Sequence, residues 1–366
     1  MGFKCGIVGL PNVGKSTLFN ALAGTAAAES ANYPFCTIEP NVGRVAVPDP
    51  RLGTLGEIAQ SDSIVPTHLE FVDIAGLVAG ASKGEGLGNN FLGHIREVDA
   101  ICHVLRCFED DGITHVTGQV DPLSDAATID TELMLADLES LEKRMEGLVK
   151  RARGGDKDAK ASLALAERAA AALREGEPAR AIAITPDEAS HWRQLQLLTT
   201  KPVLYVCNVD EGSAVDGNAM TALIAEKAAA EGAECVVISA AIESEIAQLG
   251  DAEERQEFLD SLGLEATGLA RLIHAGYHLL SLLTFFTAGP KEARAWTIAR
   301  GTAAGAAAGT IHTDFERGFI CAETIRYDDY VSLGGEQAAK DAGVMRQEGR
   351  DYIVVDGDVL LFRFNV

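Results

Sequence analysis

One short stretch near the start of the chain limits the possible fold more than any other feature. It reads Gly9-Leu10-Pro11-Asn12-Val13-Gly14-Lys15-Ser16-Thr17 and matches the pattern G-x-x-x-x-G-K-S. The apolar run at 3–8 predicts a buried strand, and residues 17–23 have helical spacing. A strand, a glycine loop and a helix in this order aim backbone N–H groups and a helix N-terminus at one point. The sequence therefore predicts a binding site for a polyphosphate.

The loop's side chains suit a nucleotide. Lys15 is expected to reach the β- and γ-phosphates and to serve catalysis, and the Ser16 hydroxyl is expected to ligate Mg²⁺. The residues that we assign to nucleotide binding here are Asn12, Val13, Gly14, Lys15, Ser16 and Thr17.

Two later segments are candidates for the metal and the γ-phosphate. Residues 24–66 begin as a loop of small residues and continue as an extended segment, in which Thr37 is the candidate to complete the Mg²⁺ shell. An ordinary threonine at the start of a strand is the alternative. The strand at 68–73 ends in Asp73, which opens the pattern D-x-x-G. Asp73 is expected to hold Mg²⁺, mostly through water, and the Gly76 N–H to sense the γ-phosphate.

The residue after Gly76 bears on catalysis. Ras-like GTPases place a glutamine there to orient the attacking water, and this chain has Leu77. Hydrolysis must therefore be slow or use another polarising group. His115, in the loop after the buried strand at 100–108, is a candidate catalytic helper. A lone loop histidine that is merely solvated is the alternative.

Two strand ends further on bear on the base. The strands at 202–207 and 235–238 end at Asn208-Val209-Asp210-Glu211 and Ser239-Ala240-Ala241. GTPases carry N-K-x-D and S-A-K at these places, and their aspartate accepts two hydrogen bonds from guanine. Glu211 is one methylene longer and cannot occupy that geometry, so the pattern favours ATP. We assign to nucleotide binding Asn208, Val209, Glu211, Ser239 and Ala240.

From Asp130 the sequence pattern changes to the spacing of a long helix. The spacing of 4-3-4-3 predicts a heptad seam along Met134, Leu138, Leu141, Met145 and Leu148. Gly154-Gly155 interrupts it, and an alanine-rich helical stretch follows at 159–173. Two antiparallel helices in a coiled-coil hairpin are expected. Five basic residues gather at the end of the first helix, where either a solvated face or a nucleic-acid or partner contact is possible: Lys143, Arg144, Lys150, Arg151 and Arg153.

Composition limits the class of protein. A chain of 366 residues needs two or three domains, and a net charge of −23 argues against coating nucleic acid by bulk charge. The seven cysteines show no zinc spacing, and several lie in apolar runs, which suits buried thiols in a reducing cytoplasm. Neither a signal peptide nor an apolar run long enough to cross a membrane is evident. The residues after about 281 predict a small mixed sheet with a helix at 336–342, without a catalytic constellation.

These motifs together resemble the YchF subfamily of Obg-related phosphate-loop NTPases over essentially the whole chain. The segments that carry the resemblance are 9–17, 33–41, 73–77, 84–88, 208–211, 286–289, 311–315 and 364–366. No matched position departs from the family pattern.

The resemblance implies an α/β fold with three parts: a Ras-like nucleotide-binding domain at 1–128 and 200–280, an inserted helical coiled-coil domain at 129–199, and a C-terminal α+β TGS domain at 281–364. It also implies hydrolysis of ATP in preference to GTP and association with ribosomes. Asn12 matches an asparagine that binds a monovalent cation in related NTPases, so K⁺ is a further expected cofactor beside Mg²⁺. Neither a membrane nor DNA is expected as a partner. A GTPase switch and an RNA-binding scaffold independent of hydrolysis are the alternative functions.

Overall fold

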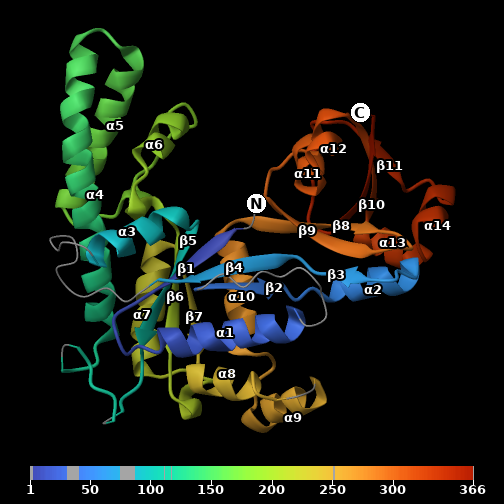
Figure 1. Ribbon diagram of the computed structural model, residues 1–366, viewed down its shortest axis with the longest axis horizontal. Helices are drawn as coiled ribbons and strands as arrows, with labels where there is room; N and C mark the ends of the chain where they lie inside the picture. The colour runs from blue at the N-terminus through green and yellow to red at the C-terminus, as the bar shows by residue number, and fades with distance from the viewer. Residues whose placement is uncertain are drawn as a thin grey trace. The chain divides into compact units, whose positions relative to one another are not determined.

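The computed structural model describes residues 3–30, 41–74, 87–110, 112–116, 118–249 and 252–365, and the chain forms two compact units (Figure 1). The larger unit comprises residues 3–43 and 70–279, and the smaller unit comprises residues 44–69 and 280–366. The family resemblance implies that residues 44–69 belong to the nucleotide-binding domain, whereas by packing they join the C-terminal part of the chain. Among the described residues, no helix has the length and apolarity needed to span a bilayer.

The larger unit is built on a sheet with strand order β2-β4-β1-β5-β6-β7. Four neighbouring pairs are parallel: β1 with β4, β1 with β5, β5 with β6, and β6 with β7. Parallel strands bring their carboxyl ends to one edge, which gathers the predicted motifs there. The strands are β1 (Lys4–Val8), β2 (Val42–Ala46), β4 (His68–Asp73), β5 (Ala100–Arg106), β6 (Val203–Asn208) and β7 (Glu234–Ile238).

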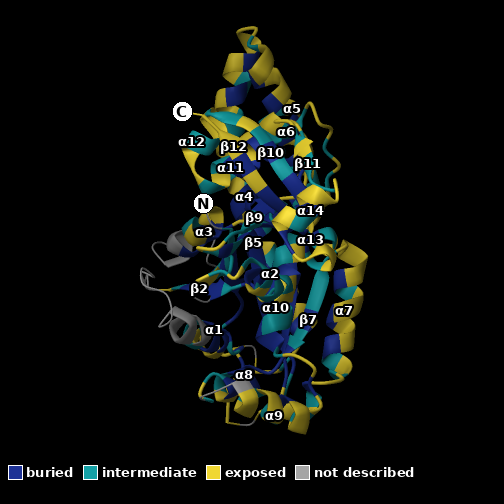
Figure 2. Cartoon of the chain, turned by 90° about the vertical axis from the view of Figure 1, so that its right-hand side faces the viewer, coloured by how far each residue is buried: buried dark blue, intermediate teal, exposed yellow. Residues whose placement is uncertain are grey.

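Helices of the larger unit bury one stripe and expose the other. In α7, the buried residues Thr221, Ile224 and Ala228 recur every three or four positions, and Figure 2 shows exposed residues on the rest of that helix. The helices of this unit outside its inserted segment are α1 (Lys15–Ser30), α3 (Leu87–Glu97), α7 (Ala219–Glu231), α8 (Ala240–Ile246), α9 (Ala252–Leu262) and α10 (Gly268–Leu279), with a short 3₁₀ turn, η4 (Glu211–Ser213).

The inserted segment forms the predicted helical hairpin. Helix α4 (Pro122–Arg153) and helix α5 (Lys157–Arg174) lie side by side (Figure 1). Leu141 and Leu148 of the heptad seam are buried in their common core, and the other seam residues pack against it. The return to the sheet runs through η2 (Ala179–Ala181), α6 (Ala189–Leu195) and η3 (Leu198–Thr200).

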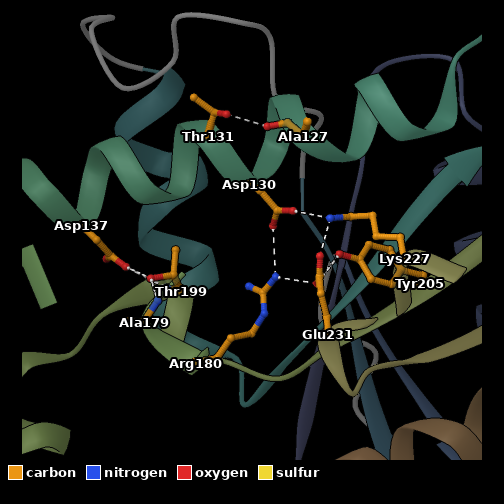
Figure 3. Close-up of polar contacts among 10 residues, drawn as sticks. All are labelled: Ala127, Asp130, Thr131, Asp137, Ala179, Arg180, Thr199, Tyr205, Lys227 and Glu231. Carbon is orange, nitrogen blue, oxygen red and sulfur yellow. Dashed lines mark hydrogen bonds and ion pairs between the residues drawn. The ribbon is translucent and has the colours of Figure 1, made fainter. Parts of the chain in front are cut away.

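Charged side chains connect the start of α4 and the segment η2 to helix α7 (Figure 3). Arg180 of η2 lies 3.5 Å from Asp130 of α4 and 3.1 Å from Glu231 of α7. Glu231 also accepts a hydrogen bond of 2.9 Å from the Tyr205 hydroxyl, and Lys227 lies 3.6 Å from Asp130. Ion pairs and hydrogen bonds that share partners in a half-buried network strengthen one another. This network therefore joins the inserted segment to the larger unit near both ends of the insert.

A second anchor lies at the buried Asp137 of α4. Its carboxylate accepts hydrogen bonds from the backbone N–H groups of Leu198 and Thr199, at 2.7 and 2.8 Å, and from the Thr199 hydroxyl at 2.6 Å. Thr199 in turn accepts one from the Ala179 N–H at 3.1 Å (Figure 3). Burial raises the pKa of Asp137, and the hydrogen bonds from Thr199 and Leu198 oppose the shift.

The smaller unit contains a mixed sheet of order β11-β10-β12-β8-β9-β3, as the sequence predicts in outline. Consecutive residues of β8 point to opposite faces, so Phe285 joins a core with α11 while Phe286 joins a second core with α2. Its elements are α2 (Pro50–Ala59), β3 (Ile64–Val65), β8 (Leu282–Ala288), β9 (Ala293–Ala299), α11 (Ala304–Ile311), α12 (Thr313–Arg317), β10 (Phe319–Arg326), α13 (Tyr327–Leu333), α14 (Glu336–Asp341), β11 (Arg346–Glu348) and β12 (Asp358–Phe364).

Direct contacts explain why residues 44–69 belong to this unit. Arg51 bridges Asp49, the N-cap of α2, to Asp356 at 2.7 Å, and the Ser61 hydroxyl donates to the Gly289 carbonyl at 2.7 Å. Strand β3 pairs in parallel with β9. No local sequence pattern indicates these long-range pairings.

Two local predictions are wrong. Residues 24–30 continue helix α1 instead of forming a loop, because the run is rich in alanine, the strongest helix former. The apolar run at 269–283 has helical spacing and predicts a single helix, but α10 ends at Leu279 and β8 begins at Leu282, where pairing with β9 outweighs helix propensity.

Candidate nucleotide-binding site

A cavity of about 530 Å³ lies at the carboxyl edge of the parallel sheet in the larger unit. It gathers segments that are far apart in the sequence: the glycine loop, the end of β5, the end of β6 and the start of α8. The predicted residues among its lining are Asn12, Gly14, Thr17, Asn208, Val209, Glu211 and Ala240. The topology therefore brings most of the predicted nucleotide-binding residues to this lining, which does not include Lys15, Ser16 or Asp73.

Asn208 holds the two halves of the cavity together. Its amide nitrogen donates to the Val13 carbonyl at 2.9 Å, and its amide oxygen accepts from the Ala240 N–H at 2.9 Å. Gly14 lies against this side chain with φ +95°, and a Cβ there would come within 2.3 Å of the Asn208 amide nitrogen. Only glycine meets both conditions, which is the physical reason for that glycine in the motif.

Lys15 begins helix α1 and is almost fully buried, with 8% of its surface exposed. Its ammonium group donates to the Leu10 carbonyl at 2.7 Å, so it lies folded back over the glycine loop. Burial lowers the pKa of Lys15 to about 8, and the charge of Asp73 opposes the shift. An ammonium group held this way gains strongly from an anionic ligand.

Asp73 and Ser16 have the chemistry that a magnesium ion requires. Asp73 lies at the end of β4, opposite Ile7 of β1, and one of its carboxylate oxygens is buried without a partner in the described structure. Burial raises the pKa of Asp73, and Lys15 opposes the shift. Ser16 is exposed at the start of α1. Among the described residues, no group of three or more His, Cys, Asp or Glu side chains is placed to hold a metal ion.

The base end of the cavity is different in character. Val209 is buried, with 3% exposure, and its N–H donates to the Ile238 carbonyl at 2.9 Å. Asp210 faces Ser213, whose N–H it accepts at 3.0 Å, so it is occupied within its own turn. Glu211 is exposed and lines the cavity. Ser239 is buried, and its hydroxyl has no partner among the described residues.

Sequence reasoning missed part of the lining. Phe108, Glu109, Asp110 and Ile113 belong to the loop after β5 and also border the cavity. The buried Arg106 positions this loop by donating to the carbonyls of Phe108 (3.1 Å), Asp110 (3.2 Å) and Ile113 (2.9 Å). The sequence signal that could have indicated this loop is an arginine at the end of an otherwise apolar strand.

His115 lies in the same loop but outside the cavity lining. Its ring is buried and its Nε2 lies 3.0 Å from the Asp125 carboxylate in the first turn of α4. Burial raises the pKa of Asp125, and the hydrogen bond with His115 opposes the shift. The neighbouring Thr114 carbonyl accepts from the Asn12 amide at 3.1 Å, which connects this loop to the glycine loop. Thr37, Gly76 and Leu77 lie outside the described residues.

Known proteins match this chain over its full length. A relative from Haemophilus influenzae, named a ribosome-binding ATPase YchF, is 58% identical over 366 residues and covers 100% of both chains. The protein of the same name from Escherichia coli O157:H7 is 57% identical, and that from Bacillus subtilis is 56% identical, each over 100% of both chains. The chain belongs to the YchF family.

Two family models and a solved structure agree with this assignment. The model described as a 50S ribosome-binding GTPase matches residues 4–143, and that of the YchF GTPase C-terminal domain, described as a protein of unknown function, matches residues 282–365. The structure of the Schizosaccharomyces pombe YchF GTPase is 39% identical, covers 99% of this chain and 98% of its own, and superimposes with a TM-score of 0.89. The names of these relatives differ on the base, since some are called ATPases and others GTPases.

Proposed function

We propose that this protein binds and slowly hydrolyses ATP and associates with the ribosome in the cytoplasm. The observation that supports ATP most directly is the base end of the cavity, where Val209 and Glu211 stand at the positions of a guanine-reading lysine and aspartate. The exposed carboxylate of Glu211 could accept a hydrogen bond from the amino group of adenine, where guanine carries a carbonyl oxygen. An unmatched polar group in a desolvated pocket is costly, so the site should discriminate between the two bases.

The phosphate end supplies the rest of the binding chemistry. Lys15 would leave the Leu10 carbonyl for the β- and γ-phosphates, and backbone N–H groups of residues 12–17 would surround them. Ser16, Asp73 and the predicted Thr37 are the residues that would hold Mg²⁺, which when bound neutralises charge that develops on the phosphates. The amide oxygen of Asn12 is the group that would ligate K⁺, since its amide nitrogen is occupied by Thr114.

Hydrolysis depends in this proposal on a rearrangement of His115. The Gly76 N–H would sense the γ-phosphate, while Leu77 cannot polarise water. His115 would have to leave Asp125 to do so, because its ring is buried against that residue and does not line the cavity. This cost makes slow intrinsic turnover the expected behaviour.

The deciding experiment measures affinity and turnover of ATP and GTP on the purified protein, with and without ribosomes and K⁺. ATP should bind more tightly than GTP, and ribosomes should change its turnover. Preference for GTP would establish a GTPase switch instead. If a Lys15→Ala variant retained the cellular function, an RNA-binding scaffold would replace both.

The basic end of α4 is a candidate ribosome contact. Lys143 pairs with Glu139 and Arg151 pairs with Asp156, whereas Lys150 and Arg153 have no ion pair within the described chain. Clustered cations can bind RNA on an acidic protein, because salt screens each field within about 10 Å at 0.1 M.

We therefore expect the triple change Lys150→Ala, Arg151→Ala and Arg153→Ala to weaken co-sedimentation with ribosomes and to flatten its salt dependence. ATP hydrolysis without ribosomes should not change. If binding across a salt series matches that of the unchanged protein, the cluster is only a solvated face, and the C-terminal unit becomes the favoured contact.

A further inference from the structure

A second cavity in the larger unit has a positively charged lining, although the chain as a whole is strongly acidic. It measures about 450 Å³ and lies where the segment returning from the helical hairpin meets the end of α3. We call it the basic pocket, and its lining consists of Arg96, Trp192, Arg193, Gln196, Leu197, Thr200 and Lys201. The chain has 54 acidic and 31 basic residues, yet this lining has three cations and no acid. That distribution indicates an anionic ligand.

The three cations are not equivalent. The Lys201 ammonium donates to the carbonyls of Arg96 and Val98, so it neutralises the carbonyl end of α3 and is held in place. Burial lowers the pKa of Lys201, and the charges of Asp99 and Asp137 oppose the shift. Asp137 is itself occupied by Leu198 and Thr199. Lys201 therefore contributes mainly the electrostatic attraction of its positive charge, because its ammonium group already donates hydrogen bonds within the protein.

The two arginines remain available to a ligand. Arg193 is exposed, and toward the described part of the chain only its Nε donates, to the Ala189 carbonyl at 3.3 Å. Arg96 is an exposed residue, and its guanidinium makes neither a hydrogen bond nor an ion pair with any described residue, although its charge also acts on the buried Asp137. Each can therefore present a planar pair of N–H donors, the geometry that matches a phosphate group.

Trp192 adds a flat aromatic surface to the same lining. It is half-buried and packs against the apolar core of the hairpin. Its indole N–H has no partner among the described residues. Aromatic rings beside arginines are the usual platform for unpaired bases of single-stranded nucleic acid.

We propose that the basic pocket binds an unpaired nucleotide of a single-stranded RNA segment, with Trp192 stacking on the base and Arg96 and Arg193 contacting the phosphates on either side. The inference deepens the proposed association with ribosomes and rests on it. A duplex offers no unstacked base, and an acidic peptide offers the indole no planar partner, so neither uses the whole lining.

Fluorescence provides the first test. The chain contains two tryptophans, so a Trp296→Phe variant leaves Trp192 as its only reporter. The full-length variant, saturated with Mg²⁺ and ADP, is titrated with single-stranded hexauridylate RNA. Stacking should quench the emission of Trp192, with a matching affinity from the anisotropy of a labelled RNA. Absence of quenching at RNA concentrations that saturate anisotropy would overturn the stacking assignment.

Variants then separate the pocket from bulk charge. Arg96→Gln with Arg193→Gln should weaken hexauridylate binding at least tenfold, and Trp192→Leu, which keeps an apolar contact with the core, should weaken it about fivefold. Trp192→Phe should restore most of the loss. The matched control Lys157→Gln with Lys160→Gln removes the same charge from exposed positions of α5 and should have less than a twofold effect. An equal loss in the control would mean that only bulk charge matters.

Competitors identify the ligand class. Uridine monophosphate should compete at least 100-fold less well than hexauridylate, because it lacks the second phosphate and the neighbouring nucleotides. Equal competition by the mononucleotide would make this a free-nucleotide site, and equal competition by duplex RNA or hexaglutamate would refute base stacking. ATP hydrolysis and ribosome co-sedimentation of the unchanged protein test the proposed function separately, so failure of RNA binding in the pocket is distinguishable from failure of that function.

Discussion

The two ends of the nucleotide cavity are built in different ways. At the phosphate end, each position is fixed by close contacts: Gly14 has no room for a Cβ, and Lys15 is buried and hydrogen-bonded. At the base end, the lining consists of a buried valine, an exposed glutamate and a loop whose backbone carbonyls accept hydrogen bonds from Arg106. The close contacts at the phosphate end therefore leave little room for substitution, while a few side-chain changes at the base end can alter which base is preferred.

This difference has a chemical origin. Every nucleoside triphosphate presents the same phosphates, so one backbone geometry serves them all. Bases differ only in a few donors and acceptors, and a pocket reads them through individual side chains. We expect substitutions at the phosphate end to affect ATP and GTP alike, and those at the base end to change the ratio between the two nucleotides.

The largest effect is expected from Lys15→Ala. Losing a charge-assisted contact to phosphate costs about 2–3 kcal/mol, or roughly 30- to 150-fold in affinity, and should affect ATP and GTP equally. Isothermal titration with both nucleotides measures this, and Lys160→Ala, at an exposed position, is the control. Wild-type affinity in Lys15→Ala would refute the assignment of the phosphate site.

At the base end, the double change Val209→Lys and Glu211→Asp should move preference from ATP toward GTP. Gaining a paired polar contact in a desolvated pocket is worth about 1–3 kcal/mol, which changes the affinity ratio roughly 5- to 150-fold. Competition between labelled ATP and unlabelled GTP gives the ratio directly. An unchanged ratio would show that backbone groups, and not these two side chains, choose the base.

The pH dependence of ATP binding gives a smaller effect, confined to the phosphate end. The pKa of Lys15 is about 8 in the unliganded protein, so Lys15 loses its charge above that pH, while bound phosphates would favour the charged form. ATP affinity should therefore be steady below pH 8 and fall above it, by at most about tenfold per pH unit. A Lys15→Arg variant keeps its charge throughout and should lack this slope. A flat profile for the unchanged protein would contradict the lowered pKa.

The smallest effect concerns Asn12. Its backbone has φ 64°, so glycine is the substitution that removes the side chain without strain. Asn12→Gly should abolish any stimulation of ATP turnover by K⁺ over Na⁺, by a few-fold, and leave the ATP/GTP ratio alone. Turnover measured in matched potassium and sodium buffers tests this. Stimulation that survives the substitution would place the cation elsewhere.

The strand and the helix that flank the glycine loop could be predicted from the sequence because their signals are local. The strands ending at Val8, Asp73 and Asn208 are confirmed as β1, β4 and β6, since apolar runs and parallel pairing impose the same order. The helical hairpin is confirmed for the same reason, because its heptad seam lies within one helix.

The parts that escaped prediction depend on long-range contacts. Residues 44–69 carry no strong pattern of their own and are placed by pairing with residues more than 220 positions away, such as Ser61 with Gly289. Phe108 and Ile113 reach the cavity only because Arg106 folds the loop around its guanidinium. Neither contact leaves a periodic trace in the sequence.

The bridge that Asn208 makes to Val13 also sets an order of events during synthesis. It joins positions 195 residues apart, and the helical hairpin is translated between them. At roughly 5–20 residues per second, a ribosome needs about 10–40 s to proceed from the glycine loop to the residue that braces it. A nascent chain therefore carries the whole phosphate-binding motif long before it can hold a nucleotide, and competence to bind arrives late, when β6 and the start of α8 emerge.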